Sequence, residues 1–457
     1  MAKYKVYPEY KDSGVEWLGE VPSHWEILSA KRMFQSVRTP ACKNDEQLAA
    51  SQKYGVIPQS LMMQLNDSKV MLALKGTESF RHVEANNFVI SLRSFEGGIE
   101  YSQYTGCVSP AYTVLKNSKP ISYSYYRYLL KCSPFIAALQ SSTDSLRDGK
   151  SINYEQFSAL SLPISSVQEQ NIIATFLDHE TVKIDNLIEK QQQLIELLKE
   201  KRQAVISHAV TKGLNPDVPM KDSGVEWLGE VPAHWKVSKL KYFASIQGGF
   251  AFSSDSFTHE GIQILRIGNL YQNNLELERQ PIFLDVNELD RFRDFAIYKD
   301  DILMSLTGTL GKRDYGFAIK VDRDDVFLLN QRVAKITPDE TRLCRDFLLY
   351  ILWSDSYLNQ LYSLPSGTKQ ANLSNSNVTD ILVACPAEIS EQKSIIEIVT
   401  KQMEVFDSLM DNSLILMESL QERRTALISA AVTGKIDVRD WVAPETQDVE
   451  EPEEATA

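Results

Sequence analysis

The chain has 457 residues and a mass of 51.8 kDa, with 43% hydrophobic and 24% charged residues. This length suits two or three domains, and the composition excludes a disordered chain. No apolar run approaches the ~20 residues of a membrane span, and five scattered cysteines exclude a disulfide framework or a zinc ribbon, so we expect a soluble, cytoplasmic protein. The net charge of −13 argues weakly against binding to nucleic acid.

A segment near the N-terminus recurs in the middle of the chain. The first repeat segment, Lys11–Trp25, reads KDSGVEWLGEVPSHW, and the second, Lys221–Trp235, differs only in having Ala233 in place of Ser23. Such self-similarity predicts two copies of one structural unit. Histidines and tryptophans within these segments are interpreted as structural packing residues: His24, His234, Trp17, Trp25, Trp227 and Trp235.

The block after the first repeat segment mixes short β-like runs with turns. Residues 26–165 contain 15 Lys and Arg against 11 Asp and Glu. The apolar run Asn87–Arg93 is followed by Gly97 and Gly98 and then by the run Tyr112–Leu115. Strands that alternate with polar or glycine-rich loops predict an α+β domain.

A long helix is predicted next, between Glu169 and Gly213. Ser166 and Glu169 have the spacing of a capping box, and Gly213 is a plausible C-terminal stop. About 45 residues at ~1.5 Å each give a rod of roughly 65 Å. Its apolar residues follow a heptad-like ladder: Ile173, Leu177, Ile184, Leu187, Leu194, Leu198 and Val205.

The second block, residues 236–389, is again β-like but shares almost no alignable sequence with the first. It contains 17 Lys and Arg against 20 Asp and Glu. The run Asp301–Leu306 precedes a loop, Thr307–Arg313, that superficially resembles a phosphate loop. Because Lys312 is followed by Arg and not by Ser or Thr, the loop lacks the required spacing.

A second long helix repeats the first at an offset of 222 residues. Glu391–Lys435 matches Glu169–Gly213, and Gly434 is the corresponding stop. Neither helix can bury its apolar stripe alone, so we expect the two to pair in an antiparallel coiled coil. The ladder of the second copy is Ile395, Val399, Phe406, Leu409, Leu416, Leu420 and Leu427.

Motifs for independent chemistry are missing. The six histidines form no HExxH pair, and no GxSxG elbow occurs. Glu391 and Lys393 have the spacing of part of a nuclease site, but the fitting Pro-Asp does not precede them. The sequence therefore predicts a non-catalytic protein without metal ligands.

Taken together, these residues resemble the specificity subunit of type I restriction–modification systems. The resemblance rests on Gly-Glu-Val-Pro-x-His-Trp at the start of each half and on a Glu-Gln-opened helix that closes each half. It also rests on the helix ends, which carry Ile-Ser and Ala-Val-Thr in both copies. The resemblance covers the chain from about Lys11 to Ile436.

The resemblance implies two target-recognition domains that each read half of a split, asymmetric DNA site. It implies that the helices set the gap between the half-sites and dock two methyltransferase subunits, through which motor–nuclease subunits join. S-adenosylmethionine, ATP and Mg²⁺ are then expected on those partners, with no cofactor on this chain. The expected organisation is residues 1–165 and 215–387 as recognition domains, 166–214 and 388–436 as spacer helices, and 437–457 as a disordered acidic tail.

Candidate contact residues are polar groups in or beside predicted loops, which suit phosphates and base edges. For DNA they are Arg38, Lys43, Lys53, Arg81, Arg93, Arg266, Asn269, Lys312, Arg313, Gln331 and Lys369. For partner docking they are Trp17, Trp25, Trp227, Trp235, Leu187, Leu198, Leu409 and Leu420.

Two other classes of protein remain open. The first is a duplicated helical scaffold that binds a partner dimer without reading DNA. The second is a remnant of a fused nuclease–methylase. Salt-sensitive DNA binding by the assembled complex separates the first from a DNA reader, and binding of S-adenosylmethionine by the isolated chain tests the second.

Overall fold

A computed structural model describes residues 4–66, 79–142, 152–364 and 369–443. The chain divides into two compact units: unit 1 comprises Met1–Gln191 and Ile415–Ala457, and unit 2 comprises Gln192–Leu414. Most of the predicted acidic tail, residues 444–457, lies outside the described residues. Among the described residues, no helix combines the length and apolar character needed to cross a membrane.

Unit 1 is built on a four-stranded antiparallel sheet. Its order is β4 (Phe34–Val37), β11 (Thr113–Asn117), β8 (Phe88–Ile90) and β9 (Glu100–Tyr101). Because strand side chains alternate between faces, Phe88 and Leu115 join the main core while Val89 and Val114 join a smaller core on the other face.

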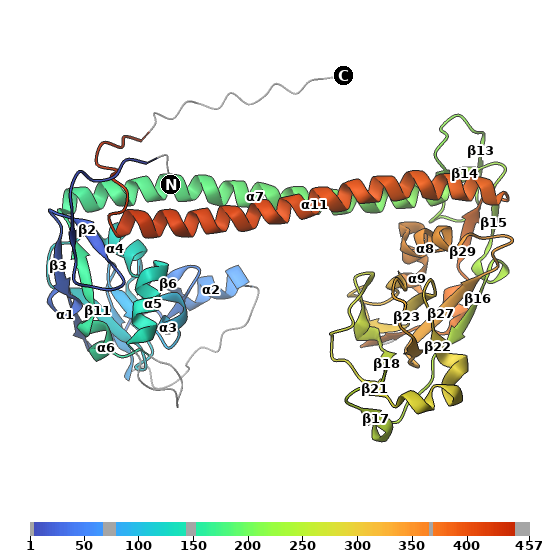
Figure 1. The fold of residues 1–457 in the computed structure, drawn as a ribbon, viewed down its shortest axis with the longest axis horizontal. Helices are drawn as coiled ribbons and strands as arrows, with labels where there is room; N and C mark the ends of the chain where they lie inside the picture. Colours follow the sequence, from blue (N-terminus) through green and yellow to red (C-terminus); the bar gives the residue numbers. More distant parts are fainter. Residues whose placement is uncertain (1–3, 67–78, 143–151, 365–368, 444–457) are drawn as a thin grey trace. The chain divides into compact units, whose positions relative to one another are not determined.

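Helices cover one face of this sheet, and two antiparallel pairs of strands cover the other. The helical face is covered by α1 (Ala30–Met33), α4 (Tyr123–Leu129), α5 (Ser133–Ser141) and α6 (Tyr154–Ala159). The opposite face carries the pairs β5 (Leu48–Ser51) with β6 (Gly55–Pro58) and β7 (Arg81–Val83) with β10 (Gly106–Val108). The short helix α2 (Gln59–Asn66) lies next to β6 in Figure 1, and α3 (Ser94–Gly97) packs against α5.

Unit 2 repeats this sheet topology on an unrelated sequence. Its order is β16 (Ala244–Gly248), β27 (Val333–Pro338), β23 (Ile302–Ser305) and β25 (Ala318–Lys320). In both units the first strand in the chain pairs with the last, and the last pairs with the second. The α+β class with two domains of similar fold is therefore confirmed.

The helices of unit 2 are α8 (Arg345–Trp353), α9 (Asp355–Ser363) and α10 (Asn375–Thr379). A second, five-stranded sheet contains β17 (Phe257–Thr258), β21 (Phe283–Leu284), β18 (Ile262–Leu265), β26 (Phe327–Leu329) and β22 (Ala296–Ile297). Only β18 and β26 pair in parallel there. Two short pairs complete the loops: β19 (Leu270–Tyr271) with β20 (Asn274–Leu275), and β24 (Thr307–Thr309) with β28 (Gln370–Asn372).

The repeat segments and the block ends form matching pairs of strands. Each repeat segment holds a hairpin, β1 (Tyr10–Asp12) with β2 (Glu20–Pro22) and β13 (Met220–Asp222) with β14 (Glu230–Pro232). The start of each block pairs with its end, β3 (Glu26–Ser29) with β12 (Ser161–Ile164) and β15 (Lys236–Lys239) with β29 (Leu382–Cys385). Each block therefore begins and ends at neighbouring positions, next to the frame that the repeat segments and the long helices form.

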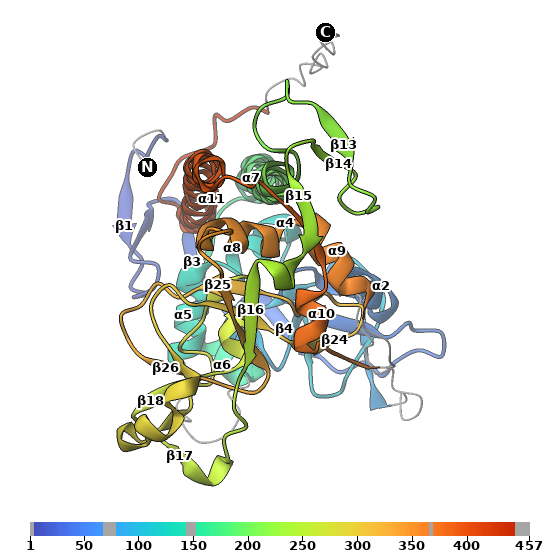
Figure 2. The ribbon, with the colours of Figure 1, turned by 90° about the vertical axis from the view of Figure 1, so that its right-hand side faces the viewer.

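Two long helices, α7 (Val167–Lys212) and α11 (Ile389–Val432), lie side by side in both views (Figures 1 and 2). In unit 1 the Arg424 guanidinium lies 2.8 Å from the Asp185 carboxylate, and in unit 2 the Arg202 guanidinium lies 3.5 Å from the Asp407 carboxylate. Asp407 and Arg424 are the repeat equivalents of Asp185 and Arg202. The same pair thus forms crosswise in each unit, which confirms the antiparallel, pseudo-two-fold pairing.

The heptad ladder is only partly buried. Leu187 and Leu194 on α7 are 47% and 39% exposed, and their repeat equivalents Leu409 and Leu416 on α11 are 44% and 45% exposed. The pairing of the two helices therefore buries the ladder only in part. The ladder packs near the ends of each helix, where it also meets the domain cores, and is exposed along the middle.

Candidate nucleic-acid interface

Each long helix begins on a carboxylate that is held by a repeat segment. In unit 1 the indole N–H of Trp25 donates to Glu169 over 3.0 Å, and His24 Nε2 lies 3.0 Å from the same carboxylate. Tyr7 also donates to Glu169, over 2.8 Å. Burial, together with this carboxylate, raises the pKa of Tyr7, so its phenol stays protonated and remains a donor.

Unit 2 repeats the arrangement. Trp235 donates to Glu391 over 2.9 Å, and His234 Nε2 lies 3.0 Å from it. Glu391 therefore has a structural role, consistent with the missing nuclease motif. Ser166 does accept from the backbone N–H of Glu169, but the Glu169 side chain turns to Trp25, so the predicted reciprocal capping box is only half formed.

The next residue on each helix fixes the domain to it. The carboxamide oxygen of Gln170 accepts the backbone N–H of Ser122 over 2.8 Å, and that of Gln392 accepts the N–H of Cys344 over 2.7 Å. The two donor residues, Ser122 and Cys344, directly precede the helices α4 and α8 that cover the sheets. The Glu-Gln pair was visible in the sequence as a repeat, but its bonding partners belong to the unalignable blocks and could not be identified there.

The opposite end of each helix also meets a repeat segment. Gly213 and Gly434 both have φ of 73°, the left-handed conformation that glycine tolerates, which confirms them as helix stops. A Cβ on Gly213 would lie 3.3 Å from the Trp235 ring, and one on Gly434 would lie 3.2 Å from the Trp25 ring. Each repeat segment is thus a joint between the start of one long helix and the end of the other.

The predicted docking residues divide by burial. Trp25, Trp235, Leu198 and Leu420 are at most 8% exposed and pack the chain's own cores, so they offer no surface to a partner, and their assignment to docking is corrected. Trp17 is half-buried against Phe135. The residues that do offer apolar surface are Trp227, Leu187 and Leu409.

In unit 2, three loops that carry predicted contacts meet around a cleft of about 500 Å³. Strand β24 lines it, together with Ile267, Gly268, Tyr271, Asp314, Phe317, Lys369 and Gln370. Arg279 also lines it, with its guanidinium 4.4 Å from the ring centre of Tyr271. Arg279 was not among the predicted contacts. It follows the acidic residues Glu276 and Glu278, and no strand was predicted beside it.

The predicted residues of unit 2 differ in accessibility. Lys312, Arg313, Gln331 and Lys369 are exposed. Arg266 is half-buried, and its guanidinium donates to the carbonyl of Gln280. Asn269 was wrongly assigned to DNA contact. It is 1% exposed, and its carboxamide accepts the Arg266 N–H and donates to the Glu276 carbonyl, as a turn residue does.

In unit 1 the exposed predicted residues are Arg38, Lys43, Lys53 and Arg93. Lys53 lies 5.0 Å from the ring centre of Tyr54 and lines a cleft of about 890 Å³ beside α4, α7 and α11. Arg81 is half-buried, and its guanidinium donates to the carbonyl of Tyr112 over 2.5 Å. This bond gives Arg81 a structural role.

The predicted cations differ from the other cations of the unit 1 cleft in whether a carboxylate pairs with them. The other cations that line the cleft of unit 1 are paired with carboxylates: Arg127 with Asp178, Lys131 with Glu100, and Arg424 with Asp185. In contrast, none of the nine predicted Lys and Arg contacts forms an ion pair with a carboxylate of residues 4–66, 79–142, 152–364 or 369–443. All of them except Arg81 and Arg266 are also exposed, and unpaired, exposed cations are the groups that displace counterions from phosphates.

Comparisons with known proteins agree with this arrangement. A family model described as "Type I restriction modification DNA specificity domain" matches residues 22–199 and again residues 232–414. The chain is 25% identical over 425 residues to the type I restriction enzyme MjaVIII specificity subunit of Methanocaldococcus jannaschii, covering 92% of this chain and 95% of that protein. It is 23% identical over 323 residues to the EcoBI specificity subunit of Escherichia coli, covering 68% and 65%.

A solved structure shares the fold. It addresses complex assembly and conformational transition of the type I R-M system, and one of its chains superposes with a TM-score of 0.64 at 12% identity. The match covers 90% of this chain and 98% of that one.

Proposed function

The chain belongs to the type I restriction modification DNA specificity family, and on this premise we propose that its two domains read the two halves of a split, asymmetric DNA sequence. The observation that carries the proposal is the double match of the family model, one match on each domain. The two domains have the same topology of their four-stranded sheets, but their loops share no alignable sequence. One frame with two different loop sets suits the reading of two different half-sites.

The cleft of unit 2 is the proposed reading surface of the second domain. It combines Lys369 and Arg279 with the polar groups of Gln370 and Thr309. Cations position a protein on phosphates, whereas amides and hydroxyls bond to base edges. In the first domain, the exposed unpaired cations Arg38, Lys43, Lys53 and Arg93 supply the phosphate contacts.

The exposed leucines of the long helices are the proposed docking sites for two methyltransferase subunits. Unit 1 exposes Leu187 and Leu416, and unit 2 exposes their repeat equivalents Leu409 and Leu194. Two equivalent apolar patches suit two copies of one partner. We propose that motor–nuclease subunits join through these partners and that the helices set the unread gap between the half-sites.

The chain is a non-catalytic recognition subunit, as are its relatives. The carboxylate with the spacing of a nuclease residue, Glu391, is bonded to Trp235. We propose that S-adenosylmethionine, ATP and Mg²⁺ are bound by the partner subunits.

Adenine-methylation mapping tests the function directly. The chain is expressed in a host with a cognate methyltransferase subunit, and the methylated positions of the genome are read. A single split motif, with two short half-sites around a fixed gap, is the expected result. A stable complex that produces no new methylation would favour the scaffold without DNA reading.

A further inference from the structure

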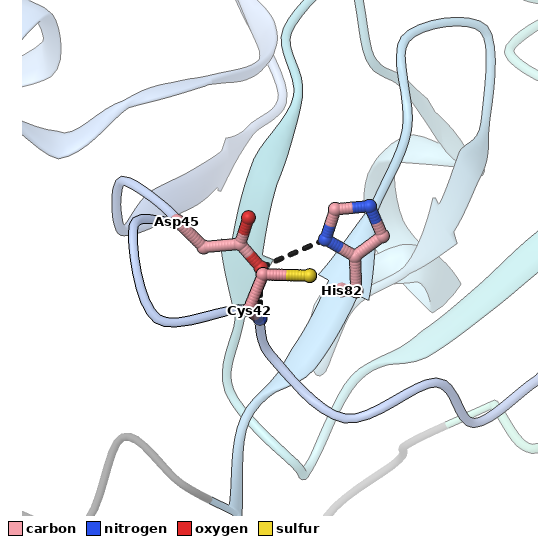
Figure 3. Close-up of side chains that lie close together, drawn as sticks. All are labelled: Cys42, Asp45 and His82. Carbon is pink, nitrogen blue, oxygen red and sulfur yellow. Dashed lines mark hydrogen bonds and ion pairs between the residues drawn. The ribbon is translucent and has the colours of Figure 1, made fainter.

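Three side chains with different metal-ligating atoms converge in unit 1, away from the long helices. The Cys42 thiol, the Asp45 carboxylate and the His82 imidazole point toward one another in Figure 3. Each offers one donor atom, and the three atoms all lie within 4.8 Å of one another. Cys42 and Asp45 belong to one loop, whereas His82 is the central residue of β7.

The Asp45 carboxylate is already at the centre of this group. Its Oδ2 lies 2.7 Å from His82 Nδ1 and accepts the backbone N–H of Cys42 over 2.7 Å. The Asp45 and His82 side chains are only 7% and 16% exposed. The Cys42 thiol, in contrast, has no hydrogen-bond partner among the described residues, although it is aimed at the pair.

Backbone hydrogen bonds hold the loop in place on both sides. The N–H of Ala41 donates to Phe80 over 2.9 Å, and that of His82 donates to Thr39 over 2.8 Å. On the other side, the N–H of Cys107 donates to Glu46 over 2.8 Å. Within the loop, the N–H of Asp45 closes a turn onto the Cys42 carbonyl over 3.1 Å. The three donors are therefore positioned by the fold before any ligand binds.

We propose that Cys42, Asp45 and His82 form a zinc-binding site. A thiolate, an imidazole and a carboxylate suit Zn²⁺, whereas Mg²⁺ and Ca²⁺ prefer oxygen ligands alone. Ligand atoms of a tetrahedral zinc ion lie roughly 3.3 to 3.6 Å apart, so a small adjustment of side chains suffices. Water fills the fourth position.

Binding exchanges protons for the ion. The Cys42 thiol loses its proton to solvent, and His82 would bind the ion through Nδ1 as a neutral imidazole whose one proton lies on Nε2. The backbone N–H of Cys42 stays on the Asp45 carboxylate and orients it from outside the coordination shell. None of the three zinc ligands is a proposed DNA contact, so the zinc site does not depend on the proposed function.

The test uses the full chain and the metal ions alone. After incubation with Zn²⁺ and gel filtration, metal analysis is expected to find about one zinc per chain. With Co²⁺ in its place, a thiolate-to-cobalt charge-transfer band is expected in the near ultraviolet. Cys42→Ala is the key variant: because Cys42 is exposed and its backbone bond survives, the fold is retained while zinc affinity falls more than about tenfold.

Cys344→Ala serves as the matched control. Cys344 is the most accessible of the other cysteines and lies in unit 2, so the zinc content and the cobalt band should match those of the unchanged chain. Failure of the unchanged chain to bind Zn²⁺ would overturn the proposal and leave Asp45 and His82 as a hydrogen-bonded pair. Equal zinc content in Cys42→Ala and the unchanged chain would overturn it as well, because the ion would then lie elsewhere.

Discussion

At the scale of single residues, one carboxylate in each unit ties the repeat segment to the start of a long helix. Glu169 accepts hydrogen bonds from Trp25 and Tyr7, and Glu391 accepts one from Trp235. Each indole is buried in its core, so its N–H needs a partner inside the protein. Loss of the glutamate in either copy would leave the buried indole N–H without this acceptor.

Removal of Glu169 should therefore destabilise unit 1. Glu169→Ala leaves a buried indole N–H without an acceptor, at an expected loss of about 1–3 kcal/mol in the free energy of unfolding. Glu391→Ala should cost less, because the Glu391 side chain is 33% exposed and that of Glu169 is 6% exposed. Urea unfolding measures both, with the exposed Glu196→Ala on α7 as the control. Equal, negligible losses in the two variants would refute the structural role of the joint.

Lys369 carries a second prediction at this scale. It lines the cleft of unit 2 and forms no ion pair within the described part of the chain, so Lys369→Ala should remove one phosphate contact. The slope of log affinity against log salt for the assembled complex is then expected to fall by about 1. Lys199→Ala, which removes a cation paired with Glu196 at 3.1 Å, should leave the slope unchanged. A slope unaffected by Lys369→Ala would place the DNA elsewhere.

At the scale of elements, each long helix packs into the domain cores near its ends and exposes leucines of the same heptad pattern in its middle. Near their ends, Ile173 and Leu427 join the core of unit 1, and Ile206 and Ile395 join that of unit 2. In the middle of each helix, the heptad positions Leu187 and Leu409 face solvent. A heptad pattern predicts an apolar stripe, but whether a partner helix of the same chain covers it depends on the packing of the whole element.

The two exposed leucines are expected to dock one methyltransferase subunit each. Leu187→Glu and Leu409→Glu should each lower the number of bound methyltransferase subunits from two to one, and the double variant should bind none. Native mass spectrometry of the complex counts the subunits. Leu197→Glu is the control, because this exposed leucine has Ser419 as its repeat equivalent. Retention of two subunits by the double variant would exclude these patches as docking sites.

At the scale of the whole molecule, the fold separates a repeated frame from exchangeable blocks. Each block begins and ends on paired strands, with Lys236 opposite Cys385 in unit 2. The frame residues that hold the block, Trp235 and Glu391, lie just outside these strands in the sequence. A block can therefore be replaced while its supports remain.

Exchange of residues 236–387 for the corresponding block of another specificity subunit should change one half-site only. The other domain keeps its own sheet, its own core and its own loops. Methylation mapping of the exchanged chain reads both half-sites in one experiment. A change in both half-sites would show that the two domains do not read DNA independently.

The sequence by itself determined the duplicated frame. Helix periodicity, glycine stops and the repeat segments are local signals, because each depends on residues close together in the chain. They were sufficient for the two long helices, their antiparallel pairing and the family resemblance. For the same reason, cations in predicted loops could be named in advance, since charge and turn-forming residues are visible in any sequence.

Tertiary structure alone decided what depends on contacts distant in the sequence. The shared sheet topology of the two blocks lies in strand pairings between residues that no local pattern links. Burial distinguished Asn269, a turn residue, from Lys369, a surface cation, although both are polar loop residues. Cys42 and Asp45 meet His82 only because β7 brings it back to their loop. The sequence gives the chemistry of each side chain. Which side chains lie close together depends on packing, because the free energy of the whole fold selects the contacts.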